Sequence, residues 1–418
     1  MRRALQVGVG VACLAGLAAH RLGPPRLSLA GTEPEPRAAS HAPEALQRAV
    51  RYSRERERLW LAGTAYGLAT GLLSVSSGAP GRLSRALESR LSPRLRTPAF
   101  ILIWSAQDWL LGLPLAYYSG YVVEHRYGLS HHTRRSWLTE QLKGVAVGTV
   151  INTPLLTGFY ALVRRFPRTW WLVVSALALP FTVLLAGLYP VLIAPLFNKY
   201  VPLDDPKLAE RVRAMAEREG VKVSQVLRMD MSRQTSKANA FFTGVGRTKR
   251  IVLADTLLDG FSPQEVEVVV AHELAHQVHR DTLKLVGLSG VGTFAGAYAL
   301  HRIFPTVLRR TRTRTGSASL GEVASLPLVE LVASLFGLLA MPLANAYVRR
   351  LERSADAYAV RLTGNPRAFI SAMRQLQRTN LSDPEPPAVV RLLLHSHPTI
   401  GERIRWAESQ AHDFGHSS

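Results

Sequence analysis

The chain has 418 residues, of which 47% are hydrophobic and 19% charged, and its formal net charge is +21. This hydrophobic content excludes a disordered chain, and the length allows two or three domains. The single cysteine, Cys13, excludes an internal disulfide and a cluster of thiolate ligands, so any metal must be bound by His, Asp or Glu. The arginines lie at the ends of apolar stretches rather than in one segment, which favours a membrane protein over a nucleic-acid binder.

Apolar stretches recur along the chain at lengths that suit a bilayer. A hydrocarbon core about 30 Å thick is crossed by ~20 apolar helical residues, and the sequence predicts about seven such spans. The first, residues 4–19, is predicted to be an uncleaved span, with a signal peptide as the alternative. The other six are predicted at residues 59–79, 99–121, 144–163, 170–193, 283–300 and 326–348.

Two acidic residues, Asp108 and Glu330, fall inside predicted spans. A carboxylate is costly in lipid, so both should face water or the interior of the helix bundle. They either line a polar chamber or make hydrogen bonds between helices. Between the spans, residues 198–280 carry charges at helical spacing and a β-rich section, which is typical of a water-soluble domain, and the chain becomes polar and helical again from Arg349.

The segment from Phe261 to His276 predicts a helix with a defined start. Ser262 and Glu265 have the spacing of a capping box, and Pro263 occupies the first helical position, where its missing N–H does no harm.

Within that helix, His272 and His276 lie one turn apart on one face, where two imidazoles can bind a single Zn²⁺. Glu273 is rotated by about 100° from the first histidine, so it can reach a water molecule on the metal, which is the position of a general base. The alternative is a histidine-rich surface helix. His279 and Asp281, just beyond, are predicted to lie on the helix surface or behind the ligands rather than to bind metal.

A catalytic zinc needs a third protein ligand and keeps one position open. The candidate is Glu352, and Asp356 lies on the same helical face, where it can accept the second N–H of a ligating histidine. The alternative for this pair is a solvated charged turn beside a span.

The pattern His272-Glu273-Leu274-Ala275-His276 with Glu352-x-x-x-Asp356, separated by two apolar spans, resembles the CAAX prenyl protease 1 type of integral-membrane zinc metalloendopeptidase. The resemblance extends from about Tyr118 to Trp406, and the first 58 residues match poorly. Further similar segments are residues 124–129, 193–200 and 236–242, Ser396-His397-Pro398, and Arg403-Ile404.

The resemblance implies a mainly α fold, in which a transmembrane bundle of about seven helices surrounds a water-filled chamber. A zincin-like α+β catalytic domain with a small β-sheet completes it. The expected divisions are a first hydrophobic segment and linker at 1–58, an amino-terminal membrane domain at 59–197, and a zinc metallopeptidase domain at 198–418. A membrane hairpin at about 283–348 interrupts the last of these.

The resemblance also implies roles for residues. One Zn²⁺ per chain is held by His272, His276 and Glu352, with Asp356 behind the ligands and Glu273 as the base. His397 and Arg403 are implied to stabilise the oxyanion, and their alternatives are a helix-capping His-Pro and a structural salt bridge. An extended substrate is implied to pair with the edge strand at Asn239, Ala240 and Phe241.

The implied reaction is removal of the last three residues after a prenylated cysteine, although the family also acts on other membrane-associated peptides. The expected partners are a peptide or protein substrate, which can be lipidated, and membrane lipid, with no nucleic acid. The expected location is the cell membrane in a bacterium or the endoplasmic reticulum membrane in a eukaryote. Two alternatives stay open: a quality-control metalloprotease of the heat-shock type, and a multi-span transporter or scaffold with a structural zinc.

Overall fold

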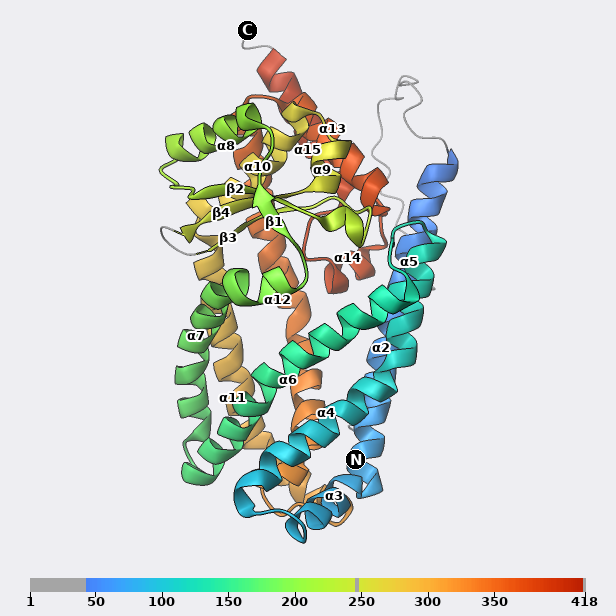
Figure 1. Ribbon diagram of the computed structural model, residues 1–418, viewed down its shortest axis with the longest axis vertical. Coiled ribbons are helices and arrows are strands. Elements are labelled where there is room, and N and C mark those ends of the chain that lie inside the picture. The colour runs from blue at the N-terminus through green and yellow to red at the C-terminus, as the bar shows by residue number, and fades with distance from the viewer. Residues whose placement is uncertain (1–42, 245–247, 416–418) are drawn as a thin grey trace. The chain divides into compact units, whose positions relative to one another are not determined.

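The computed structural model describes residues 43–244 and 248–415 (Figure 1). The described chain is mainly helical and contains a four-stranded sheet, as the sequence predicts. It divides into two compact units. Unit 1 comprises Met1–Arg58, Gly260–Ala275 and Met341–Ser418, and unit 2 comprises Leu59–Asp259 and His276–Ala340.

Within the described residues, six helices are long and apolar enough to cross a membrane. They coincide with the last six predicted spans, whereas the predicted first span, residues 4–19, lies outside the described residues. The structure thus confirms the multi-span helical class. The six helices are α2 (Pro43–Ser77), α4 (Pro93–Tyr117), α6 (Arg134–Arg165), α7 (Trp170–Leu188), α11 (Asp281–Thr315) and α12 (Leu326–Thr363).

Short irregular turns extend two of these helices. Helix α4 passes through the π-helical turn η1 (Tyr118–Val122) into α5 (Val123–Arg126), and α7 passes through η2 (Tyr189–Ile193) into the 3₁₀ turn η3 (Ala194–Leu196). The short helix α3 (Ala79–Glu88) joins α2 to α4, and its backbone turns at Gly78, whose φ of 69° suits glycine.

Apolar side chains hold the membrane helices of unit 2 together in two buried clusters. Tyr160, at the centre of one cluster, shares a hydrogen bond of 3.2 Å with Ser325 in the 3₁₀ turn η6 (Val323–Ser325), so its buried hydroxyl is satisfied. The first cluster contains Val75, Val163, Trp170, Leu300, Phe304, Leu308 and Leu328, and the second contains Phe100, Ile101, Trp104, Tyr160, Val323 and Leu326.

Asp108 on α4 and Glu330 on α12 both have exposed side chains. Glu330 also makes a side-chain hydrogen bond with Trp104 of α4. Glu330 therefore makes the helix–helix hydrogen bond that is one of the two predicted possibilities.

The sheet of unit 2 has the strand order β1-β2-β4-β3. Strands β2 (Gln225–Met229) and β4 (Arg250–Ala254) are parallel, and the outer strands β1 (Tyr200–Pro202) and β3 (Ala240–Thr243) are antiparallel to their neighbours. Because β3 is last in this order, it is an edge of the sheet. Strand β4 is fully buried from Ile251 to Ala254, which fits its run of apolar residues. Helix α8 (Pro206–Arg218) begins at Asp205, whose side chain accepts hydrogen bonds from two backbone N–H groups of its first turn.

Helices dominate unit 1. Its core contains the carboxyl-terminal part of α12 together with α13 (Pro366–Asn380) and α15 (Ile400–Gly415), where Phe369 packs edge-on against Trp406. Thr399 and Glu402 form a capping box that starts α15. Two further helices are α10 (Pro263–Val278) and α14 (Ala388–Leu394), and α9 (Asp255–Gly260) precedes α10.

Candidate metal centre

Helix α10 begins where the sequence predicts. The Ser262 N–H donates to Oε2 of Glu265 at 2.7 Å, and the Glu265 N–H donates to the Ser262 hydroxyl at 3.4 Å, which is the predicted capping box. Glu265 also accepts a hydrogen bond from Ser371 of α13 through its other oxygen, at 2.5 Å. The start of the helix is therefore fixed both locally and by tertiary structure. Because His272 and His276 lie further along the same helix, their positions depend on where it starts.

Three potential ligands gather around this helix. His272, His276 and Glu352 each offer one donor atom, and these atoms lie within 4.8 Å of one another. The Nε2 atom of His272 is 3.2 Å from Oε2 of Glu352. Two imidazole nitrogens and one carboxylate oxygen are the donor set of a catalytic zinc site, in which the fourth position is left open. The residues present therefore fit a zinc ion.

Each histidine has a carboxylate behind it. Nδ1 of His272 lies 2.9 Å from Oδ1 of Asp356, and Nδ1 of His276 lies 2.9 Å from Oδ2 of Asp281. Such contacts select the tautomer that presents Nε2 to a metal. The sequence predicts the position of Asp356, and it leaves Asp281 between the helix surface and a place behind the ligands. The structure assigns Asp281 to the latter.

Arg403 on α15 is buried against Asp356. Its Nε and Nη2 atoms lie 2.9 and 2.5 Å from the two carboxylate oxygens, and Nη2 is also 3.5 Å from Nδ1 of His272. This is the structural ion pair that the sequence allows as the alternative role for Arg403. A bidentate pair of this kind fixes the plane of the carboxylate as well as its charge.

The site has a strong effect on the protonation of His272. Burial alone lowers the pKa of the imidazole, but hydrogen bonds with Asp356 and Glu352 outweigh it and raise the pKa to about 9. In the absence of metal the imidazole is therefore in its charged form, with a proton on both nitrogens, at neutral pH. Since a ligating histidine must be neutral, metal binding has to displace that proton.

Glu273 and His397 lie beside the three potential ligands. Glu273 is half-buried and follows His272 directly on α10. His397 is exposed, its Nε2 atom is 3.4 Å from Oε1 of Glu352, and its Nδ1 atom is 3.0 Å from the Ser396 hydroxyl. The structure thus brings His397 to the carboxylate that completes the group.

Two residues without a recognisable motif in the sequence, Asn345 and Arg349, hold the segment before His397. Asn345 donates to the carbonyl of Leu393 at 2.7 Å, and the buried Arg349 donates to the carbonyls of Arg391 and His395 at 3.2 and 2.5 Å. The carbonyls of Arg391 and Leu393 belong to the last turn of α14, where the helix itself supplies no N–H partner. A cation at a helix carboxyl terminus is favourable there. From the sequence, Arg349 resembles any arginine that flanks a span. Only its spacing of four residues from Asn345 indicates that the two side chains lie on one face of the helix.

The segment predicted to align substrate lies in unit 2. Ala240 and Phe241 belong to strand β3, and the backbone carbonyl of the exposed Asn239 accepts a hydrogen bond from the Ala254 N–H at 3.0 Å. Pairing with β4 therefore begins one residue before the strand. Because β3 is an edge of the sheet, this register also fixes the backbone groups on its outer side.

Comparison with known families accounts for most of the chain. The profile of peptidase family M48 matches residues 202–411, and the profile of the CAAX prenyl protease amino-terminal domain, with five membrane helices, matches residues 27–199.

Individual proteins agree with these matches. The chain is 31% identical to an uncharacterised metalloprotease of Bacillus subtilis, YhfN, over 91% of this chain and 89% of that protein. It is 29% identical to CAAX prenyl protease 1 of Saccharomyces cerevisiae over 86% and 85% of the two chains. The crystal structure of S. mikatae Ste24p covers 95% of both chains with a TM-score of 0.81 and 25% identity. The chain therefore belongs to peptidase family M48, within its CAAX prenyl protease group, and is a membrane-embedded metalloprotease.

Proposed function

We propose that this protein is a zinc endopeptidase that processes the carboxyl termini of membrane-associated proteins. The observation that carries the proposal is the convergence of His272, His276 and Glu352, with a carboxylate behind each imidazole. That arrangement supports a catalytic rather than a structural metal, because its three donors leave a position open.

His272, His276 and Glu352 would hold the zinc. When bound, the ion would lower the pKa of a coordinated water towards roughly 7 and polarise the scissile carbonyl. Asp356 and Asp281 fix the orientation of the two imidazoles and select the tautomer that presents Nε2 to the metal, at Nδ1 distances of 2.9 Å.

Glu273 takes the proton of the attacking water and passes it to the leaving amine. Its place directly after His272 supports this role, because the helix turns its carboxylate beside the ligands rather than onto the metal. His397 donates to the oxyanion of the tetrahedral intermediate, and its exposed ring at 3.4 Å from Glu352 supports that assignment. Arg403, which is paired with Asp356, acts by holding that carboxylate ionised behind His272.

The substrate is an extended peptide that adds to strand β3 at Asn239, Ala240 and Phe241. Main-chain hydrogen bonds along an edge strand hold a peptide in register with little regard to its side chains. Support comes from the position of β3 at the end of the sheet and from the exposed Asn239.

The substrate class follows from the relatives. CAAX prenyl protease 1 of yeast is named for processing prenylated CAAX termini, and the five-helix amino-terminal domain of that group is present here. We therefore propose a prenylated or otherwise membrane-associated carboxyl terminus, with bilayer lipid around the protein. The membrane is the cell membrane in a bacterium and the endoplasmic reticulum membrane in a eukaryote. The amino-terminal domain disfavours the quality-control alternative of the heat-shock type, and membership of a peptidase family disfavours the transporter or scaffold.

The test is cleavage of a farnesylated carboxyl-terminal peptide and of its unprenylated twin by the detergent-purified protein, with zinc measured on the same sample. We expect one zinc per chain and cleavage after the prenylated cysteine only. Zinc with equal cleavage of both peptides would keep the peptidase but remove the lipid from recognition. Cleavage of unfolded membrane proteins but of neither peptide would favour quality control.

A further inference from the structure

The chain that leads into strand β3, residues 230–239, is attached on one side to the sheet of unit 2. We call it the strand-entry segment. Oδ1 of Asp255 accepts the Ser232 N–H at 2.8 Å, and Oδ2 accepts the Ser232 hydroxyl at 2.5 Å. Further along, the Thr256 hydroxyl donates to the carbonyl of Lys237 at 2.8 Å. Both partners follow β4 directly, so the segment is tied to the strand with which β3 pairs.

On its other side the segment pairs with the connection between helices α5 and α6, which belongs to the amino-terminal membrane part of the chain. Ser130 and Thr235 form an antiparallel β-bridge. The Thr235 hydroxyl donates to the carbonyl of Leu129 at 2.6 Å, and the Ser236 hydroxyl donates to the carbonyl of Gly128 at 3.1 Å. A short two-stranded contact thus lies just before the predicted substrate strand.

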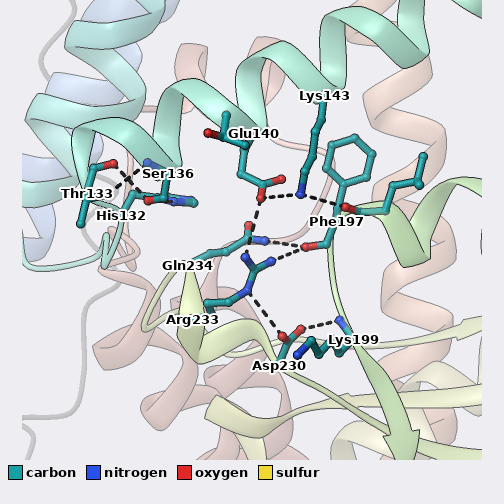
Figure 2. A network of polar contacts seen from close by, with 12 residues as sticks. His132, Thr133, Ser136, Glu140, Lys143, Phe197, Lys199, Asp230, Arg233 and Gln234 are labelled. Atoms are coloured by element: carbon teal, nitrogen blue, oxygen red, sulfur yellow. Dashed lines mark hydrogen bonds and ion pairs between the residues drawn. The ribbon is translucent and has the colours of Figure 1, made fainter.

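Two ion pairs reinforce this contact. Nζ of Lys237 lies 2.9 Å from Oε2 of Glu124 on α5, and their side chains are 31% and 13% exposed. The second pair joins Glu140 of α6 to Arg233, with 3.7 Å between Oε1 and Nη1, and the same oxygen is 3.1 Å from Lys143 on α6 (Figure 2). Both pairs therefore join a membrane helix to the strand-entry segment and are partly shielded from solvent.

The Glu140 group also fixes the chain that leaves α7. Arg233 and Gln234 both donate to the carbonyl of Phe197, at 2.5 and 2.9 Å, and Lys143 donates to the carbonyl of Leu196 at 3.1 Å (Figure 2). The membrane helices α6 and α7 and the strand-entry segment are thus connected through one set of side chains.

From these contacts we propose that Glu124 and Lys237, supported by Glu140 and Arg233, are positioning residues that set the register in which β3 receives a peptide. This rests on the proposed function of β3 as the substrate strand. A peptide on an edge strand takes its register from the backbone N–H and C=O groups of that strand, and a slip of one residue turns every side chain to the other face. Lys237 is two residues before Asn239, so the ion pair holds the chain directly before that row of backbone groups.

The test uses Glu124→Lys, Lys237→Glu and the double variant with both changes, in the full-length protein. Each single variant places two like charges together, and the double variant restores the pair with the signs exchanged. We expect each single change to raise KM about tenfold and to add cleavage one or two bonds away from the wild-type position, as seen by mass spectrometry of the products. Zinc content and kcat at the original bond should change little, and the double variant should recover the wild-type products.

Arg228→Met is the matched control, because Arg228 on β2 makes an ion pair of 3.1 Å with Asp204 elsewhere on the same sheet. It should leave both KM and the cleaved bond within twofold of wild type. Glu140→Gln, which removes the charge opposite Arg233, should change KM and the products in the same direction as the single variants.

Hydrogen exchange separates this proposal from the proposed function. Amides of residues 236–243 should exchange faster in Lys237→Glu than in wild type or Arg228→Met, whether or not a peptide is cleaved. Absence of peptide cleavage by wild type would reject the proposed function while exchange still tests the attachment. The positioning role is overturned if the single variants lose activity while KM and the cleaved bond stay unchanged. It is also overturned if the double variant does not recover the wild-type products, or if amide exchange in residues 236–243 is unchanged in Lys237→Glu.

Discussion

Nδ1 of His276 lies 2.9 Å from Oδ2 of Asp281, the same relation that His272 has to Asp356. Each carboxylate is only 2% exposed, so it contacts its imidazole from the buried side. Because the Nδ1–H is donated to a carboxylate, Nε2 of both rings remains available for a metal. The two histidines are oriented alike although their acids come from two different helices, α11 and α12.

Asp281→Asn should weaken zinc binding about 10- to 100-fold, because it removes the charge that orients and polarises His276. Competition with a chelator of known affinity measures the effect. Lys284→Met is the control, since Lys284 contacts Oδ1 of Asp281 at 2.7 Å, whereas His276 contacts Oδ2. Unchanged zinc affinity in Asp281→Asn would assign Asp281 a purely structural role.

Glu273→Gln should keep zinc and lower kcat by about 10²- to 10⁴-fold, because the amide cannot take a proton from water. Metal analysis and kinetics on one preparation provide the measurement. Glu267→Gln, on the same helix, is the control and should leave kcat unchanged. Loss of zinc in Glu273→Gln would show that the carboxylate belongs to the metal site instead.

Zinc affinity should rise with pH. The pKa of His272 is raised to about 9 in the metal-free protein, so zinc binding releases that proton at any lower pH, and the dependence from this residue is about tenfold per pH unit. The stability of the folded protein without metal changes with pH in the opposite direction. Protonated His272 stabilises it fully below about pH 6.5, and this contribution is lost as pH rises towards 9.

Titration calorimetry in buffers of different ionisation enthalpy counts the protons released by zinc. In Asp356→Asn the pKa of His272 should fall, so fewer protons should be released at pH 8 than in wild type. Equal proton release by the two proteins at that pH would contradict the assignment of the raised pKa to the Asp356 contact.

Arg349→Met should lower kcat about tenfold while zinc is retained, because the carbonyls of Arg391 and His395 lose the donor that orders the approach to His397. Arg350→Met, the exposed neighbour, should behave as wild type. Steady-state kinetics and thermal unfolding in detergent distinguish the result from general destabilisation. An equal loss of kcat in both variants would remove the specific role of Arg349.

Local patterns in the sequence predict those parts of the structure that local physics determines. The capping box of Ser262 and Glu265 specifies where α10 starts, and helical periodicity then places His272 and His276 on one face. Long apolar stretches likewise indicate six helices that match the described spans. These signals lie within a few residues or within one helix, so they can be read without knowing the fold.

Other features depend on contacts between distant parts of the chain. Arg349 resembles any arginine that flanks a span until its carbonyl partners more than 40 residues away are known. The pairing of Ser130 with Thr235 and the ion pair of Glu124 with Lys237 join segments about 105 to 113 residues apart, and neither segment carries a strong strand pattern. The predicted roles of His397 and Asn239 and the predicted domain boundaries at residues 58 and 197 stay predictions.

Helix α12 is continuous from Leu326 to Thr363, so its apolar span and the carboxylate of Glu352 belong to one helix, with Pro342 between them. Helices adjust their tilt to the thickness of the surrounding lipid. The residue that completes the metal group is therefore carried on the same helix as a membrane span. Lipids of defined acyl-chain length should accordingly be used when the activities of variants are compared.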